Sequence, residues 1–122
     1  MKLSYVMILN SAAAFAYCLL LLIVPATILG WHGIAGDLSA QLIGRYFGVT
    51  LLGMGLISWM ARNSDDSQAR QAIVLGLLIS NLAGLVLSLY GTISGQMNVL
   101  GWLAVAVYLL LTIGFGYFQF TK

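Results

Sequence analysis

The stretch QAIVLGLLISNLAGLVLSLYGTI, residues 71–93, decides the fold class of this chain. It carries no charged residue and exceeds the roughly 20 residues that a helix needs to cross a ~30 Å hydrocarbon core. Three further apolar stretches of similar length occupy residues 3–29, 38–61 and 99–118. The sequence therefore predicts an all-α fold, a four-span transmembrane helix bundle that forms one integral membrane domain over residues 1–122.

The composition supports a membrane location. Of the 122 residues, 61% are hydrophobic and 7% are charged, so a soluble monomer would expose far too much apolar surface. The net charge is +2, but the basic residues are scattered singly and form no patch for nucleic acid. We expect the lipid bilayer as the partner of this chain, no nucleic acid, and a multi-pass location in the cell membrane, the bacterial inner membrane.

The amino terminus resembles a signal peptide only in part. Ala14-Phe15-Ala16 has the small-x-small pattern of a cleavage site. The apolar run nevertheless continues through Val24 without the polar break expected after processing. We expect an uncleaved first span.

Basic residues predict the orientation of the bundle. Lys2, Arg62, Arg70 and Lys122 fall on one face of a four-span arrangement, whereas the opposite face has only Arg45, which lies inside the second span. Lys and Arg in short loops are retained on the cytoplasmic side. Both termini are therefore predicted to be cytoplasmic.

The residues that carry chemistry are few. The chain has one His, one Cys and no acidic residue inside a predicted span, so no nucleophile, base and orienting acid can be assembled. Cys18 has no partner for a disulfide or a zinc site, and the Asp65-Asp66 pair supplies too few oxygen ligands for a metal. We expect no enzyme activity, no cofactor and no metal.

Arg45 is the residue that most needs an explanation. It lies about two turns into the second span, where an unpaired charge costs at least a few kcal/mol. Asp37, Gln41 and Arg45 recur at a spacing of four and form one row on the helix face. In one interpretation Arg45 snorkels to the outer headgroups and holds a lipid phosphate or a loop carbonyl. In the other it forms a ligand or lipid headgroup site whose candidate residues are Arg45, Gln41, His32 and Asp37, with Tyr90 or Gln96 as additions.

Pro25 and the glycines after it predict irregular backbone near the outer face. Proline removes one helical hydrogen bond, so Pro25 should bend the end of the first span. The following loop, residues 30–36, contains three glycines and is predicted to be a turn, with a lid over the bundle as the alternative.

Small residues predict where helices pack closely. A glycine or serine occurs at every fourth position of one row in the third span, and the second span carries a Gly-x-x-x-Gly motif; the residues are Gly76, Ser80, Gly84 and Ser88, and Gly44 and Gly48. Such rows let helix backbones approach each other. We expect the two rows to pack together as antiparallel neighbours within one chain, with an interface between subunits as the alternative.

Polar residues inside the spans allow two explanations. They form pairs on single helix faces: Asn10 with Tyr17, Asn81 with Ser88, and Tyr108 with Thr112. Hydrogen bonds between helices, worth about 0.6 to 2 kcal/mol each, are the favoured explanation. A polar pathway across the membrane is the alternative.

One segment suggests a family. RYFGVTLLGMG, residues 45–55, is followed by the loop with Arg62 and Arg70 and by a glycine-rich third span. This arrangement resembles small, largely uncharacterised bacterial four-helix membrane proteins of the broad DoxX-like group. The resemblance implies a four-helix bundle and supplies no catalytic residue.

Two functions fit these observations. The first is a small non-catalytic integral membrane protein, an accessory or assembly subunit that packs against itself as a homo-oligomer or against a larger membrane complex. The alternative is a small transporter or binding protein for an anionic or amphiphilic ligand that enters at the outer face near Arg45.

Overall fold

The computed structural model describes residues 2–121, and this part of the chain is helical. The helices are α1 (Leu3–Ile23), α2 (Pro25–Trp31), α3 (Leu38–Ala61), α4 (Gln68–Ile93) and α5 (Gly101–Phe120). Helices α1, α3, α4 and α5 are long and apolar enough to cross a membrane. The prediction of an all-α fold with four membrane-length helices is confirmed.

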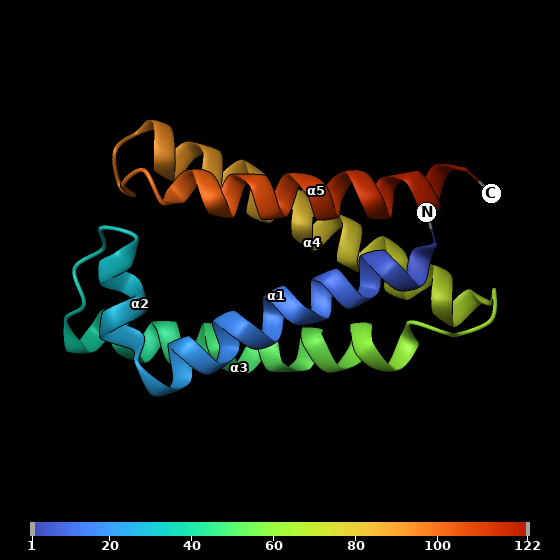
Figure 1. The fold of residues 1–122 in the computed structure, drawn as a ribbon, viewed down its shortest axis with the longest axis horizontal. Coiled ribbons are helices and arrows are strands. Elements are labelled where there is room, and N and C mark those ends of the chain that lie inside the picture. The colour runs from blue at the N-terminus through green and yellow to red at the C-terminus, as the bar shows by residue number, and fades with distance from the viewer. Residues whose placement is uncertain (1, 122) are drawn as a thin grey trace.

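The long helices form two antiparallel pairs. Helix α1 packs along α3, and α4 packs along α5, as Figure 1 shows. Helices α3 and α4 follow each other in the chain but make only a small contact. The expectation that the second and third spans pack together along their glycine rows is therefore wrong.

The two glycine rows face different partners. A Cβ at Gly48 would lie 3.2 Å from the Leu21 Cβ and 3.4 Å from the Cys18 carbonyl oxygen, both in α1. A Cβ at Gly84 would lie 2.6 Å from Cζ of Tyr108 in α5. The row on α3 packs against α1 and the row on α4 packs against α5. Close packing therefore does not require the two rows to meet.

The first span is shorter than predicted. Helix α1 ends at Ile23, and Val24 has a non-helical backbone (φ −130°, ψ 58°). Pro25 then occupies the first turn of the separate helix α2, a position where its missing N–H costs nothing. Pro25 therefore does more than bend the first span, because residues 25–29 lie in another helix. At 21 residues, α1 remains long enough to cross a bilayer.

The other spans differ from prediction only at their ends. Helix α3 has the predicted bounds, whereas α4 begins three residues early because the Ser67 side chain accepts a hydrogen bond from the Arg70 N–H at 3.1 Å and caps it. Helix α5 spans Gly101–Phe120 in place of 99–118.

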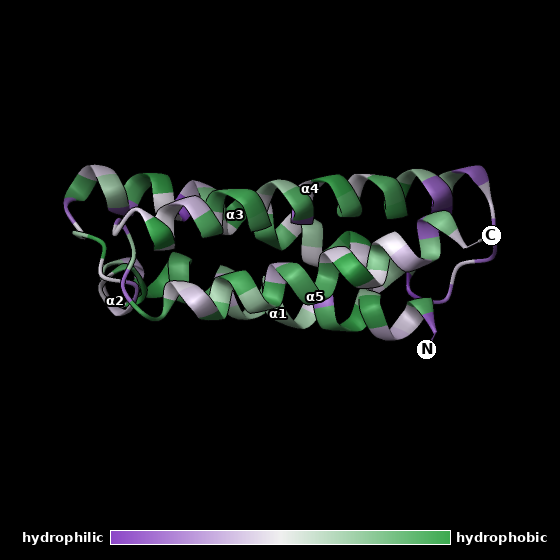
Figure 2. Ribbon diagram, turned by 90° about the horizontal axis from the view of Figure 1, so that it is seen from above, coloured by the Kyte–Doolittle hydropathy of each residue, from purple (hydrophilic) through white to green (hydrophobic). Residues whose placement is uncertain are grey.

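Hydrophilic residues gather at the two ends of the molecule, and the long helices between them are hydrophobic (Figure 2). We call one end the terminal end, because α1 and α4 begin there and α3 and α5 finish there (Figure 1). Lys2, Arg62 and Arg70 lie at this end, as predicted from the sequence, and Lys122 lies outside the described residues. We call the opposite end, which holds α2, the α2 end.

The α1–α3 pair forms one layer of the bundle and the α4–α5 pair forms the other (Figure 1). Different contacts hold these two layers together at the two ends of the molecule. Toward the terminal end, a hydrophobic core joins the long helices; its buried members are Leu3, Val6, Met7, Ala61, Val74, Leu77, Leu78, Leu111 and Phe115. At the α2 end, the loop between α4 and α5 bonds to the end of α2. The Asn98 N–H donates to the His32 carbonyl at 3.0 Å, and its side-chain amide donates to the Trp31 carbonyl at 3.1 Å.

Candidate functional site

A buried hydrogen-bond network joins three helices near the middle of the bundle. The Asn10 side-chain amide in α1 donates to the Ser58 hydroxyl in α3 at 2.6 Å, and Ser58 donates to the Met54 carbonyl at 2.9 Å. The Asn81 amide in α4 donates to the Asn10 side-chain oxygen at 3.3 Å and to the Leu77 carbonyl at 2.8 Å. These bonds satisfy polar groups that would be expensive to leave unpaired in an apolar interior. The network therefore links α1, α3 and α4 through buried side chains.

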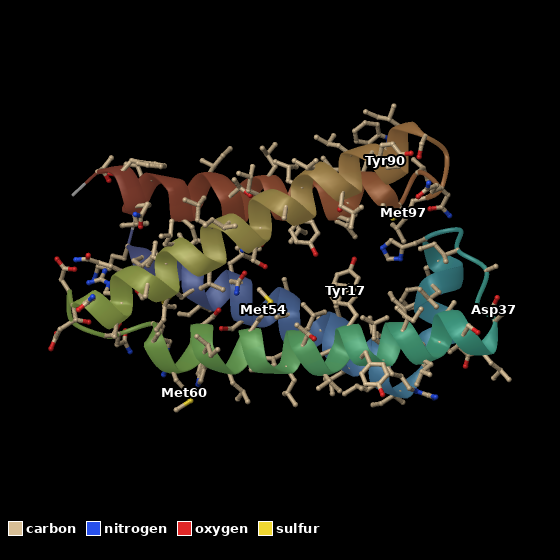
Figure 3. The ribbon with its side chains drawn as sticks, turned by 180° about the vertical axis from the view of Figure 1, so that it is seen from behind. Tyr17, Asp37, Met54, Met60, Tyr90 and Met97 are labelled. Carbon is tan, nitrogen blue, oxygen red and sulfur yellow. The ribbon has the colours of Figure 1, made fainter. Side chains whose placement is uncertain are left out.

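A second polar contact joins α1 to α3. The Ser11 hydroxyl lies 2.9 Å from the Met7 carbonyl of its own helix and 3.1 Å from the Gly55 carbonyl of α3. Met54 points into the space between the two layers (Figure 3), where its sulfur lies 4.0 Å from the Ser80 hydroxyl of α4. Sequence reasoning singled out Asn10 and Asn81 but missed Ser58. The available signal was its place on the small-residue face of α3, three positions after Gly55.

Tyr17 and His32 form another polar pair at the α2 end. Tyr17 points from α1 into the space between the layers (Figure 3), and its hydroxyl lies 3.3 Å from Nε2 of His32. The other ring nitrogen, Nδ1, lies 3.0 Å from the Ile28 carbonyl. A carbonyl can only accept, so Nδ1 carries a proton, and in the neutral form of the ring the Tyr17 hydroxyl donates to Nε2. His32 is buried and bonded to Tyr17 and Ile28, so the hydrogen bonds do not join it to Arg45.

The predicted row on α3 divides into separate contacts. The Asp37 carboxylate accepts from the Ala40 N–H at 2.8 Å and caps the first turn of α3. The Gln41 amide donates to the Gly36 carbonyl at 2.7 Å, and no hydrogen bond joins the Gln41 side chain to Arg45. Arg45 is exposed, and its Nε donates to the Leu22 carbonyl at a long 3.4 Å. That carbonyl belongs to the last turn of α1, where the helical hydrogen bonds stop.

Arg45 is consequently the member of the predicted site that has spare bonding capacity. A guanidinium has five N–H donors, and one of them reaches the Leu22 carbonyl. The Asp37 side chain bonds to the backbone in the first turn of α3, and the Gln41 side chain bonds to the backbone of the loop before α3. The geometry therefore supports one cation at the α2 end whose other four N–H donors have no hydrogen bond within residues 2–121, and the four predicted residues do not converge on one point.

The predicted packing residues also separate by surroundings. Gly44, Gly48 and Ser88 are buried, and Gly84 is partly covered by the Tyr108 ring. Gly76 and Ser80 are exposed, and a Cβ at Gly76 would meet nothing within 4 Å. A row of fourth residues rotates by about 40° per step around a helix, so its two ends face different directions.

Metal-binding groups are sparse. Among residues 2–121, no three His, Cys, Asp or Glu side chains lie close enough together to hold a metal ion. Cys18 is buried in α1 as a free thiol.

These features define an all-helical protein with four helices long and apolar enough to cross a membrane and with side-chain hydrogen bonds between them. The chain belongs to the family described as domain of unknown function DUF8292, whose model matches residues 1–118. No curated protein and no solved structure matches the chain.

Proposed function

We propose that this chain is a small non-catalytic integral membrane protein, an accessory or assembly subunit that packs against a second copy or against a larger membrane complex. We place it in the bacterial inner membrane with both termini in the cytoplasm. The buried Asn10, Ser58 and Asn81 side chains support a structural role for the polar interior, because their hydrogen bonds join one helix to another or return to the backbone of their own helix. The resemblance to DoxX-like proteins stays a prediction.

The outward face of α3 carries this proposal. Tyr46, Gly53 and Met60 are seven residues apart, so they lie above one another on one side of the helix. The Tyr46 and Met60 side chains are 68% and 78% exposed, and Met60 points away from the bundle (Figure 3). A Cβ at Gly53 would meet nothing within 4 Å. Glycine inside a helix costs about 1 kcal/mol relative to alanine, and no neighbour within residues 2–121 accounts for it here. A helix from outside the chain that approaches Gly53 closely would account for it.

Cysteine crosslinking in native membranes tests this proposal. Gly53→Cys is introduced into a Cys18→Ala background, so that the new thiol is the only one in the chain. We expect a disulfide dimer for self-assembly, or a larger adduct with a bifunctional thiol reagent for a complex with other subunits. Leu110→Cys on α5, where the native side chain is 61% exposed, is the matched control and should give neither product. Gly53→Cys that stays monomeric under both treatments contradicts the assembly role.

Arg45 supports a second candidate, a small transporter or binding protein for an anionic or amphiphilic ligand. Its side chain is exposed near the end of α1, and its hydrogen bond goes to a single backbone carbonyl at 3.4 Å. Guanidinium groups bind carboxylate and phosphate oxygens in a two-point geometry. An anionic group arriving from the α2 end would find these donors available.

A further inference from the structure

A groove runs along the surface where α1 meets α3. Its lining residues are Ile8, Ser11, Ala12 and Phe15 of α1 and Trp59 of α3, and its volume is about 320 Å³. From Ile8 to Phe15 it follows α1 for about 10 Å, at 1.5 Å per residue. One leaflet of the hydrocarbon core is about 15 Å thick, so the groove covers roughly two thirds of a leaflet.

The groove wall offers apolar surface to its occupant. The one hydroxyl in it, that of Ser11, is already within hydrogen-bond distance of the Met7 and Gly55 carbonyls. Phe15 lies against Gly55 of α3, where a Cβ would come within 2.7 Å of the Phe15 Cε1 atom. The absence of a side chain at Gly55 thus leaves room for the Phe15 ring, which lines the end of the groove farther from the terminal end.

Arg62 lies beside Trp59, at the end of the groove nearer the terminal end. Arg62 follows the last residue of α3, and its Cζ lies 3.7 Å from the centre of the Trp59 ring. Its Nη1 donates to the Trp59 carbonyl at 2.5 Å, which satisfies one carbonyl at the end of α3. The other four N–H donors of the guanidinium have no hydrogen bond within residues 2–121 and can serve an external acceptor. Tryptophan prefers the headgroup level of a bilayer, so the pair marks where lipid phosphates lie.

We propose that this groove is a binding site for one anionic phospholipid, with an acyl chain along Ile8, Ala12 and Phe15 and with the phosphate on Arg62. Arginine matches phosphate in charge and in hydrogen-bond geometry. The chemistry of the groove favours this occupant over a helix from another subunit, because an apolar wall that ends beside the Arg62 guanidinium matches an acyl chain next to an anionic phosphate. The inference rests on the integral membrane location and not on the assembly role of α3.

Native mass spectrometry of the full chain in mild detergent tests the site. The protein is incubated with phosphatidylglycerol or with phosphatidylcholine of the same acyl chains. We expect wild type to retain one phosphatidylglycerol about fivefold more than phosphatidylcholine, the factor that one basic residue near a membrane surface contributes. Arg62→Gln should bind both lipids equally, whereas Arg70→Gln, which removes a basic residue at the same end, should keep the preference.

Filling the groove provides an independent measurement. Ala12→Trp should abolish retention of both lipids, and Leu110→Trp on the exposed surface of α5 should leave retention unchanged. Equal retention of the two lipids by wild type, or an unchanged preference in Arg62→Gln, overturns the proposal. So does a wild-type dimer that Ala12→Trp dissociates, because the occupant would then be a second copy of the chain. Crosslinking through Gly53→Cys reports on a different face and can fail or succeed independently of this result.

Discussion

The Asn10 side-chain amide donates a 2.6 Å hydrogen bond to the Ser58 hydroxyl, and this bond ties α1 to α3 inside the bundle. The Asn10 side-chain oxygen accepts from Asn81 of α4 at 3.3 Å, so one residue bonds to both layers. Asn10, Ser58 and Asn81 are at most 4% exposed. Hydrogen bonds between spans help to choose which helix faces pack together, because an unpaired amide in an apolar interior is costly.

Ser58→Ala should therefore destabilise the bundle. The substitution leaves the Asn10 amide without its acceptor, and a buried unsatisfied donor costs about 1 to 3 kcal/mol. Unfolding in mild detergent, followed by circular dichroism, measures the loss. Thr50→Ala is the matched control, because Thr50 is exposed and its hydroxyl bonds within its own helix, to the Tyr46 carbonyl. Equal stability of the two variants would show that the network contributes nothing.

Gly84→Leu should also destabilise the protein. A Cβ at this position already overlaps the Tyr108 ring, so a leucine must displace that ring or push α5 away from α4, at a cost of about 1 to 3 kcal/mol. Gly76→Leu tests the same substitution in the same row at a position that meets nothing within 4 Å. We expect the melting temperature of Gly76→Leu to equal or exceed that of wild type, because leucine favours helix over glycine. Equal melting of both variants would remove the α4–α5 contact as the reason for glycine at position 84.

The sequence predicted the spans well because their length and lack of charge are set by the bilayer. It did not predict which helices pair. Small residues on α3 and α4 permit close approach to any helix, and the choice of α1 and α5 depends on bulky partners such as Leu21 and Tyr108 that fill those surfaces. Pro25 indicates that the helical hydrogen bonds are interrupted near residue 25. Whether the first span then bends or a new helix begins depends on the contacts of the following turn.

Of the predicted site residues, Arg45 lies exposed near the α2 end, and Asp37 and Gln41 bond elsewhere. Asp37 and Gln41 share its helix face by spacing, yet each bonds to the nearest free backbone group, the Ala40 N–H and the Gly36 carbonyl. The Ala40 N–H belongs to the first turn of α3 and the Gly36 carbonyl to the loop before it, so the spacing of four does not determine which group each side chain bonds. Similarly, His32 turns toward Tyr17, because the break at Val24 lets α2 run across the end of the bundle and not continue along α1 (Figure 1).

Asn98→Ala should loosen the α2 end without unfolding the protein. The variant loses the amide bond to the Trp31 carbonyl and the side-chain oxygen that accepts from the Leu100 N–H, and it keeps the backbone bond to the His32 carbonyl. A net loss of about 1 kcal/mol corresponds to roughly fivefold faster opening of α2. Hydrogen exchange of the amides in α2 measures this rate. Gln96→Ala, an exposed change in the same loop, should leave the exchange rate as it is. No difference between the two variants would show that the tether does not hold α2.

A carboxy-terminal fusion tests the orientation. Lys2, Arg62 and Arg70 share the terminal end, and positive residues in short segments stay in the cytoplasm. A reporter that fluoresces only in the cytoplasm, fused after residue 122, should therefore be bright, and an alkaline phosphatase fusion at the same point should be inactive. A dark fluorescent fusion together with an active phosphatase would reverse the proposed orientation.

The last prediction concerns Arg45, where the assembly and ligand-binding proposals give different results. Arg45→Met keeps much of the side-chain volume and removes the charge. We expect the variant to fold and melt like wild type, because a single exposed 3.4 Å bond to the Leu22 carbonyl contributes little. Leu42→Met, an equally conservative change one turn earlier at a 56% exposed position, is the control for the new side chain. Native mass spectrometry then compares the bound anionic lipids and ligands of the two variants. Unchanged retention in Arg45→Met rejects the binding-site proposal and leaves the assembly role. Loss of an anionic ligand from Arg45→Met alone, with the lipid on Arg62 still bound, favours a binding or transport function at the α2 end.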